Sequence, residues 1–255
     1  MYKQAIVSKI GRNFEEGLSG KFGELGKPDY HKALSQHEAY VQALEKCGLE
    51  VEVLEADEAY PDSTFVEDVA IVTDRFAVIT NPEPESRNGE VARMEEVLKR
   101  HFSALERIVA PGTLEGGDVL QMGNTFYVGI SERTNENGAK QLAGILSKYG
   151  FQTIFVPISR AFHLKGLVSD LGDGYITVAG ELVDHPAFEG YRKIIVDPDE
   201  AYACNVLRIN EYVLIPKGYE KTKGKIVDAG FQVVELEMSE FQKQDGSLTC
   251  LSLKF

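Results

Sequence analysis

A thiol, an imidazole and several carboxylates are the side chains of this sequence that could do chemistry together: Glu67, Asp68, Glu115, Asp118, His163 and Cys250. A thiolate can attack a carbon, an imidazole can move protons, and a carboxylate can orient the imidazole or hold a cation. Buried carboxylates are costly unless a positive group compensates them. The set therefore predicts nucleophilic catalysis on a cationic ligand, with no Lys or Arg needed among the carboxylates.

Each of these residues also has an ordinary interpretation. Most free cysteines are small buried hydrophobes, and a histidine between apolar neighbours, as His163 is, is more often a core residue. Cys250, however, follows a flexible Gly-Ser segment and precedes an alternating apolar tail, which places the thiol where a loop meets a strand. No second Cys or closely spaced His supports a zinc site that uses Cys250 and His163.

Short strands alternate with helices along the chain. Apolar residues at helical spacing predict helices over residues 30–47, 89–102, 137–149 and 219–229. Alternating or continuous apolar runs predict strands over residues 5–7, 50–54, 66–72, 76–80, 119–122, 125–128, 151–156, 175–179, 193–196, 205–209, 212–215 and 231–236. Gly123-Asn124 predicts a hairpin turn between two of these strands. The pattern is that of an α/β protein.

The strands that follow a polar or glycine-containing approach recur at a long period. They start near Val66, Asp118, His163, Asn205 and Cys250, at separations of 52, 45, 42 and 45 residues. A unit of that length cannot bury its own apolar face, so the units must pack around a shared centre. Five units predict a ring whose strand starts face one axis. No Pro/Gly/Ser-rich linker divides the chain, so we expect one domain over residues 1–255.

Composition excludes several classes of function. The net charge of −13 argues against nucleic acid as a partner and permits a cationic ligand. No apolar run approaches the roughly 20 residues that cross a bilayer, so we expect no membrane partner. The N-terminus is too short and mixed for a signal peptide, and the three cysteines form no CxxC pair. We therefore expect a reduced, cytoplasmic setting.

In this order, several motifs resemble the dimethylarginine dimethylaminohydrolase family nearly end to end: Leu25-Gly-Lys-Pro-Asp-Tyr30, Pro61-Asp-Ser-Thr-Phe-Val-Glu-Asp68, Ala110-Pro-Gly-Thr-Leu-Glu-Gly-Gly-Asp118, Arg133-Thr-Asn135, His163-Leu-Lys165 and Cys250-Leu-Ser-Leu-Lys-Phe255. That family belongs to the guanidino-group modifying enzymes, or penteins. The resemblance implies a five-bladed α/β-propeller of pseudo-fivefold ββαβ-type units around a central active site.

The resemblance also implies an activity, namely the hydrolysis of asymmetric dimethylarginine or monomethylarginine to citrulline and dimethylamine or methylamine. In the implied mechanism Cys250 attacks the guanidinium carbon and forms a covalent thiouronium adduct. His163 protonates the leaving amine and then activates water, with Glu115 beside it. Neither a metal nor an organic cofactor is required.

The remaining implied residues bind the substrate, a small cationic amino acid. Glu67 and Asp68 match residues that hold the guanidinium, and Asp62, Arg87 and Arg133 match residues that grip the amino-acid end. The resemblance adds Phe65 to the binding site, together with main-chain groups of Leu18 and Gln244. Leu18 lies in a segment whose glycines suit a mobile lid. The sequence leaves a homodimer open.

Alternatives follow from departures within the motifs. Gly166 stands where related bacterial sequences tend to carry a small hydroxyl residue, and Gln244 where an apolar residue is more frequent, so the N-substituent of the substrate stays open. A related hydrolase or deiminase acting on arginine or citrulline is a second hypothesis, although Lys165 stands where arginine deiminases typically place an aspartate. A non-catalytic pentein binding protein is a third hypothesis. The joint presence of Cys250, His163 and Glu115 argues against it.

Overall fold

The computed structural model describes the backbone of residues 1–255 and the side chains of residues 1–20 and 23–255. Within these residues the strands form five three-stranded sheets. They are β15 (Leu253–Lys254), β1 (Gln4–Ser8) and β2 (Glu50–Leu54); β3 (Ala70–Val72), β4 (Ala77–Ile79) and β5 (Leu105–Arg107); β6 (Val119–Met122), β7 (Thr125–Ile130) and β8 (Gln152–Pro157); β9 (Val168–Gly172), β10 (Tyr175–Val178) and β11 (Arg192–Ile195); and β12 (Leu207–Ile209), β13 (Tyr212–Pro216) and β14 (Gln232–Leu236).

All five sheets share one plan. The first-named strand is antiparallel to the middle strand, and the middle strand is parallel to the third. A parallel pair needs a crossover, which is usually a helix. Four crossovers carry α1 (Tyr30–Lys46), α2 (Glu90–Leu98), α3 (Glu136–Lys148) and α4 (Glu220–Asp228). In the sheet of β10, the 3₁₀ turns Gly180–Leu182 and Pro186–Phe188 take the place of the helix.

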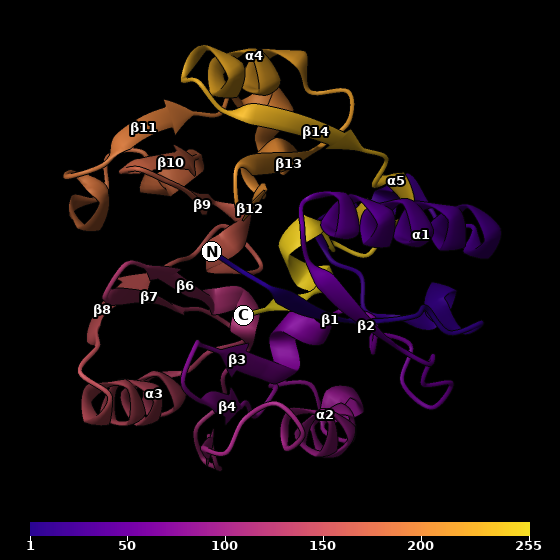
Figure 1. Ribbon diagram of the computed structural model, residues 1–255, viewed down its shortest axis with the longest axis vertical. Helices are drawn as coiled ribbons and strands as arrows, with labels where there is room; N and C mark the ends of the chain where they lie inside the picture. Colours follow the sequence, from indigo (N-terminus) through magenta and orange to yellow (C-terminus); the bar gives the residue numbers. More distant parts are fainter.

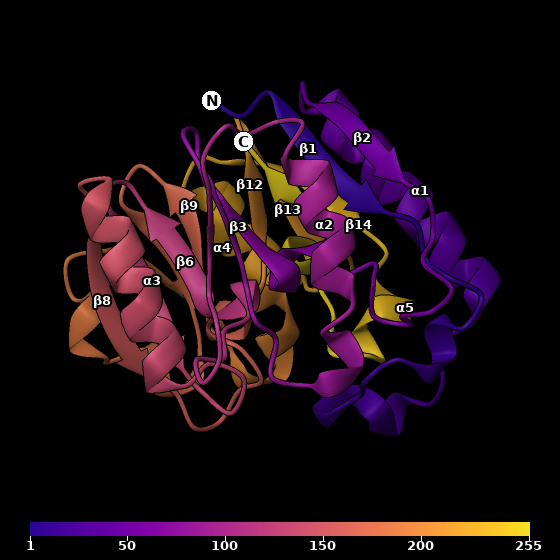
Figure 2. The same ribbon diagram turned by 90° about the horizontal axis from the view of Figure 1, so that it is seen from below.

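The helices lie at the outside of the molecule, and the first strand of each sheet lies toward its middle (Figure 1 and Figure 2). Neighbouring sheets meet through these inner strands, since β15 contacts β3, and β9 contacts both β6 and β12. The two ends of the chain meet in one sheet, where Ala5 pairs with Lys254 and Ile6 with Leu253. The last strand, which follows Cys250, is therefore held by the first.

The longest helices begin at residues that cap them. The side chain of Asp29 accepts a hydrogen bond from Lys32 N at 2.8 Å at the start of α1, and that of Asn135 accepts one from Gly138 N at 2.8 Å at the start of α3. Such caps satisfy backbone donors that the first turn leaves unpaired. The apolar side of α1, with Tyr40 and Leu44 fully buried, packs in a core shared with the turn that carries Cys250.

The five predicted strand starts fall in or next to short turns, and the inner strands begin one to five residues further along the chain, at Ala70, Val119, Val168, Leu207 and Leu253. Each inner strand is preceded by a 3₁₀ turn, and these turns span Val66–Val69, Gly116–Asp118, Leu164–Gly166, Pro198–Cys204 and Leu248–Leu251. The strand predicted from residue 66 was therefore wrong over its first four residues, where buried carboxylates are presented from a turn instead. The helix predicted over 89–102 ends at Leu98.

Two elements, β5 and α5 (Ser239–Gln242), have no counterpart in the predictions, and β9 was predicted only as a strand start near His163, without bounds. The strands β5 and β9 contain charged residues in short stretches, so their apolar pattern is too weak to indicate a strand. They form because the neighbouring strands β4 and β10 offer backbone partners.

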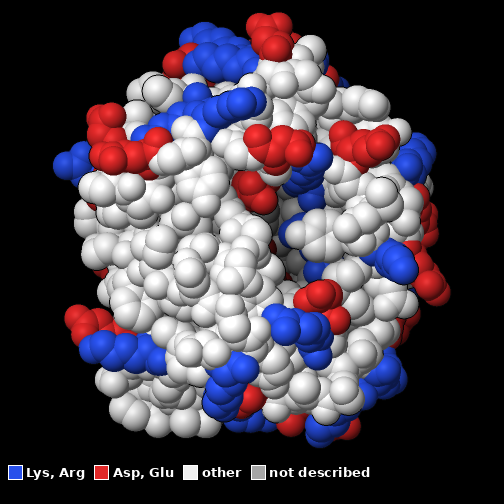
Figure 3. Space-filling view, turned by 60° about the vertical axis from the view of Figure 1, so that its left-hand side comes forward, with Lys and Arg blue, Asp and Glu red and all other residues white. Residues whose placement is uncertain are grey.

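At the surface, charges of both signs are interspersed around a hollow, next to a broad area without them (Figure 3). Among the described residues, no helix combines the length and the apolar character that crossing a membrane demands.

Candidate active site

Ten of the predicted site residues line one narrow pocket of about 30 Å³: Leu18, Asp62, Phe65, Asp68, Arg87, Glu115, Arg133, His163, Gln244 and Cys250. Phe162, Asp245 and Gly246 complete the lining. Glu67 lines a separate cavity of about 880 Å³ instead. The 3₁₀ turns before the inner strands supply Asp68 and Cys250 directly, while Glu115 and His163 immediately precede two others.

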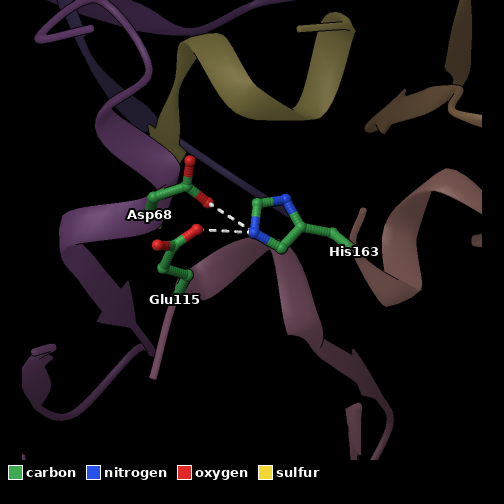
Figure 4. Close-up of side chains that lie close together, drawn as sticks. All are labelled: Asp68, Glu115 and His163. Carbon is green, nitrogen blue, oxygen red and sulfur yellow. Dashed lines mark hydrogen bonds and ion pairs between the residues drawn. The ribbon is translucent and has the colours of Figure 1, made fainter. Parts of the chain in front are cut away.

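One nitrogen of His163 faces two carboxylates (Figure 4). His163 Nε2 lies 2.6 Å from Glu115 Oε2 and 4.0 Å from Asp68 Oδ1. Asp68 is itself held, because its Oδ1 accepts from Gly117 N at 3.0 Å and its Oδ2 from Arg87 Nη1 at 2.7 Å. The imidazole is thereby oriented by groups that are fixed in turn.

The carboxylates set the protonation state of His163. Burial opposes the charged form, but the charge of Asp68 and the hydrogen bond to Glu115 outweigh it and raise the pKa of His163 to about 9. The ring is therefore an imidazolium at neutral pH and can act as a general acid. Ligand atoms of Asp68, Glu115 and His163 lie within 4.8 Å of one another and could hold a metal ion, but the metal would have to displace this proton.

Glycines explain how these groups come so close. A Cβ atom on Gly117 would lie 2.5 Å from His163 Nδ1 and 3.0 Å from Asp68 Oδ1, and one on Gly116 would collide with the carbonyl oxygen of Glu67. Only a residue without a side chain lets the turns of the neighbouring units approach in this way. The Gly-Gly pair after Glu115 is therefore required by packing between units.

Cys250 is the half-buried thiol of the pocket. Its Sγ accepts a hydrogen bond from Ser247 N at 3.4 Å, within a turn that the Ser247 side chain also caps. Burial, followed by the charges of Glu67 and Asp68, raises the pKa of Cys250 to about 12. The thiol is therefore protonated in the unliganded protein, and an adjacent cation would favour the thiolate.

The carboxylates are not free of basic partners, contrary to the prediction. Lys165 Nζ lies 2.5 Å from Glu67 Oε1, Arg87 pairs with Asp68, and Arg87 Nη2 also lies 2.8 Å from Glu90 Oε2. The reason is burial, because carboxylates this far from water need compensation even without a ligand. Lys165 stands within the conspicuous His163-Leu-Lys165 motif, whereas nothing in the sequence distinguished Glu90.

The two predicted arginines differ in their surroundings. Arg87 is buried, and its guanidinium also donates to the carbonyl oxygens of Asp62 at 3.3 Å and Phe65 at 3.1 Å. Arg133 is stacked 4.4 Å from the ring of Phe162, and its ion pair with Glu83 is long, at 3.4 Å. Arg133 is therefore the guanidinium that can more readily turn toward a ligand.

The segment around Leu18 closes over the pocket. Leu18 N donates to Asp62 Oδ1 at 3.0 Å, and Gly20 N donates to Asp245 Oδ2 at 2.5 Å. The side chain of Gln244 donates from Nε2 to the carbonyl oxygen of Phe14, at the base of this segment. The polar side chain of Gln244 therefore holds the segment that covers the pocket through a hydrogen bond.

Comparisons with known proteins point to one family over nearly the whole chain. The family model described as N,N dimethylarginine dimethylhydrolase, eukaryotic, matches residues 19–251. The N(G),N(G)-dimethylarginine dimethylaminohydrolase of Pseudomonas aeruginosa is 42% identical over 256 residues, which cover 100% of both chains. The chain belongs to the dimethylarginine dimethylaminohydrolase family. The Streptomyces coelicolor member is 38% identical over 99% of this chain and 96% of its own.

Solved structures of this family share the fold described above. A mutant of the Pseudomonas aeruginosa dimethylarginine dimethylaminohydrolase, complexed with citrulline, has a TM-score of 0.98 at 42% identity and covers 100% of both chains. The N-terminal domain of ArgZ, covalently bound to a reaction intermediate, has a TM-score of 0.89 at 19% identity and covers 98% of this chain and 97% of its own. This second likeness extends the fold beyond the dimethylarginine dimethylaminohydrolase family.

Proposed function

We propose that this protein hydrolyses Nω-methylated arginines to citrulline and the corresponding methylamine, with Cys250 as the nucleophile. The observation that carries the proposal is one pocket holding a thiol whose pKa is raised to about 12 and an imidazolium whose pKa is raised to about 9. Membership of the family supplies the substrate class. A guanidinium is the cation that such a pocket needs before its thiol can ionise.

The first half-reaction uses the charges around Cys250. The substrate guanidinium enters the pocket that Asp68 lines; Asp68 and Glu67, which lies outside that lining, are the two carboxylates whose charges raise the pKa of the thiol. Its positive charge offsets theirs, so the thiol releases its proton to solvent and the thiolate attacks the guanidinium carbon. The carbon–nitrogen bond to the methylated nitrogen then breaks as His163 gives that nitrogen its proton. Methylamine or dimethylamine departs and an S-alkylthiouronium remains on Cys250.

The second half-reaction reverses the role of His163. The ring is now neutral and accepts a proton from water, which adds to the thiouronium carbon. Collapse of the adduct breaks the carbon–sulfur bond, releases the ureido group of citrulline and returns the thiol and the imidazolium. The hydrogen bond of 2.6 Å to Glu115 supports this cycle, because it holds the ring in one orientation in both protonation states.

At the other end of the substrate we propose that Arg133 binds the α-carboxylate and Asp62 the α-ammonium group. Arg133 and Asp62 line the same pocket as Cys250. Phe65 and the main-chain groups of Leu18 and Gln244 complete the binding site. Arg87 also lines the pocket, and its bond to Asp68 supports a role in fixing that carboxylate.

We further propose that the five sheets are the blades of a pentein propeller and that residues 1–255 form one catalytic domain. The shared strand plan and the contacts between inner strands support this arrangement. A reduced, cytoplasmic location is proposed from the described cysteines Cys47, Cys204 and Cys250, which are all free thiols.

The test is a substrate panel followed by two product assays. The protein is incubated with asymmetric dimethylarginine, monomethylarginine, arginine and agmatine, and citrulline and released amine are both measured. We expect equal amounts of citrulline and methylated amine from the methylated substrates, and no turnover by Cys250→Ser. Turnover of arginine alone, with ammonia released, would replace the proposal with a deiminase.

A further inference from the structure

Asn205 marks the strand start to which the mechanism assigns no side chain. It directly follows the turn Pro198–Cys204 and is only 6% exposed. Its Oδ1 accepts from Thr249 N at 3.1 Å, and its Nδ2 donates to Thr249 Oγ1 at 3.0 Å. Thr249 is the residue before Cys250. The amide of Asn205 therefore holds the turn that carries the nucleophile at two points.

The chemistry of these groups allows one arrangement of protons. The backbone N–H of Thr249 can only donate, so the amide oxygen of Asn205 must face it and the amide nitrogen must face the hydroxyl. The hydroxyl thus accepts from Asn205 and gives its own proton to Glu67 Oε2, at 2.8 Å. The result is a directed chain of donors from Asn205 through Thr249 to Glu67.

This series of hydrogen bonds ends at the carboxylate of Glu67, whose charge raises the pKa of the Cys250 thiol. Glu67 lies outside the pocket lining, and Thr249 and Lys165 hold its two oxygens separately. The charged and titratable groups around Cys250 are Glu67 and Asp68 from one turn, Lys165 from a second, Tyr40 from α1 and Tyr202 from Pro198–Cys204. The same pocket also holds Asp62, Arg87, Glu115, Arg133, His163 and Asp245. Asn205 adds no charge to this set but fixes where Glu67 stands in it.

We infer that Asn205 is a positioning residue for the nucleophile, which acts through Thr249 on both the turn of Cys250 and the carboxylate of Glu67. The expected change in kcat rests on the proposed function, whereas the expected change in the alkylation rate of Cys250 does not. The proposed function and the positioning role of Asn205 can therefore be refuted independently.

The test is Asn205→Asp, which keeps the shape of the side chain. The remaining oxygen still accepts from Thr249 N, but the second oxygen cannot donate to the hydroxyl. The hydroxyl then turns toward the new carboxylate and leaves Glu67, and a negative charge is added near the thiol. We expect Cys250 to be alkylated by iodoacetamide several-fold more slowly at fixed pH, as followed by mass spectrometry of its peptide.

Turnover provides the second measurement. We expect kcat for asymmetric dimethylarginine to fall about ten- to a hundredfold, with a smaller change in KM and a urea midpoint near that of the wild type. Thr249→Val, which keeps the backbone N–H but loses the hydroxyl, should lower kcat similarly, and Thr249→Ser should restore it. Asn124→Asp is the matched control, because Asn124 is exposed in a turn and donates to Gly150 O.

The direction of the alkylation effect, taken together with the kcat of Thr249→Val, which adds no charge, distinguishes a positioning role from a merely structural one. A merely structural role would loosen the turn and expose the thiol, so Asn205→Asp would be alkylated as fast as the wild type or faster, and that result overturns the inference. A Thr249→Val variant with wild-type kcat overturns it as well. If the wild type releases no citrulline from methylarginines, the proposed function fails, while the alkylation rates still decide the role of Asn205.

Discussion

His163 Nε2 and Glu115 Oε2 lie 2.6 Å apart, and both residues immediately precede turns of neighbouring sheets. With Asp68 on the same nitrogen at 4.0 Å, this contact keeps the ring protonated at neutral pH. The protein thus pairs a proton donor with a thiol that stays uncharged until a cation arrives.

Glu115→Gln should move the alkaline limb of the kcat/KM profile to lower pH. The pKa of His163 is raised to about 9, in part by its hydrogen bond to Glu115, and a neutral amide supports the imidazolium less well. The general acid is then lost at lower pH, so activity at pH above neutral falls more than activity at acidic pH. The pH dependence of citrulline release measures this limb. Glu136→Gln, an exposed change on α3, is the control.

Stability should fall as the pH rises toward 9. The pKa of His163 is higher in the folded protein, at about 9, than the usual 6.5, so protonation favours folding. This contribution is fully present below about pH 6.5 and is lost through about pH 9; at about 1.4 kcal/mol per pKa unit it amounts to about 3 kcal/mol. Urea unfolding of the wild type and of His163→Gln, at low and high pH, measures the contribution of His163 to the free energy of unfolding. If the free energy of unfolding depended on pH equally in both proteins, the prediction would be wrong.

The sequence predicted which residues meet but not how their charges are balanced. The recurrence of polar strand starts brought Glu115, His163 and Cys250 to one place, because units of similar length present their starts to the same centre. The contact of Thr249 with Glu67 joins residues 182 positions apart. Such a pair depends on how turns of different sheets pack, and no local periodicity records it.

Glu67→Gln should change the thiol and the reaction in opposite directions. The charge of Glu67 raises the pKa of Cys250, and removing it leaves Lys165 without its partner at 2.5 Å. Both changes favour the thiolate in the unliganded protein, so iodoacetamide should alkylate Cys250 faster at fixed pH. Turnover should nevertheless fall by about tenfold or more, because the guanidinium loses a carboxylate. A parallel loss of both rates would show that Glu67 does not act through charge.

Gly117→Ala should lower kcat by about tenfold or more with little change in the thiol. The added Cβ would lie 2.5 Å from His163 Nδ1 and 3.0 Å from Asp68 Oδ1, so the ring must leave its position between the carboxylates. The pKa of His163 should then fall, as the NMR titration of its ring protons would report.

Gly144→Ala is the matched control, because nothing lies within 4 Å of its added Cβ on α3. That change should leave kcat intact and stabilise the helix by about 1 kcal/mol. Normal turnover by Gly117→Ala would mean that the reaction does not depend on the close approach of the two turns.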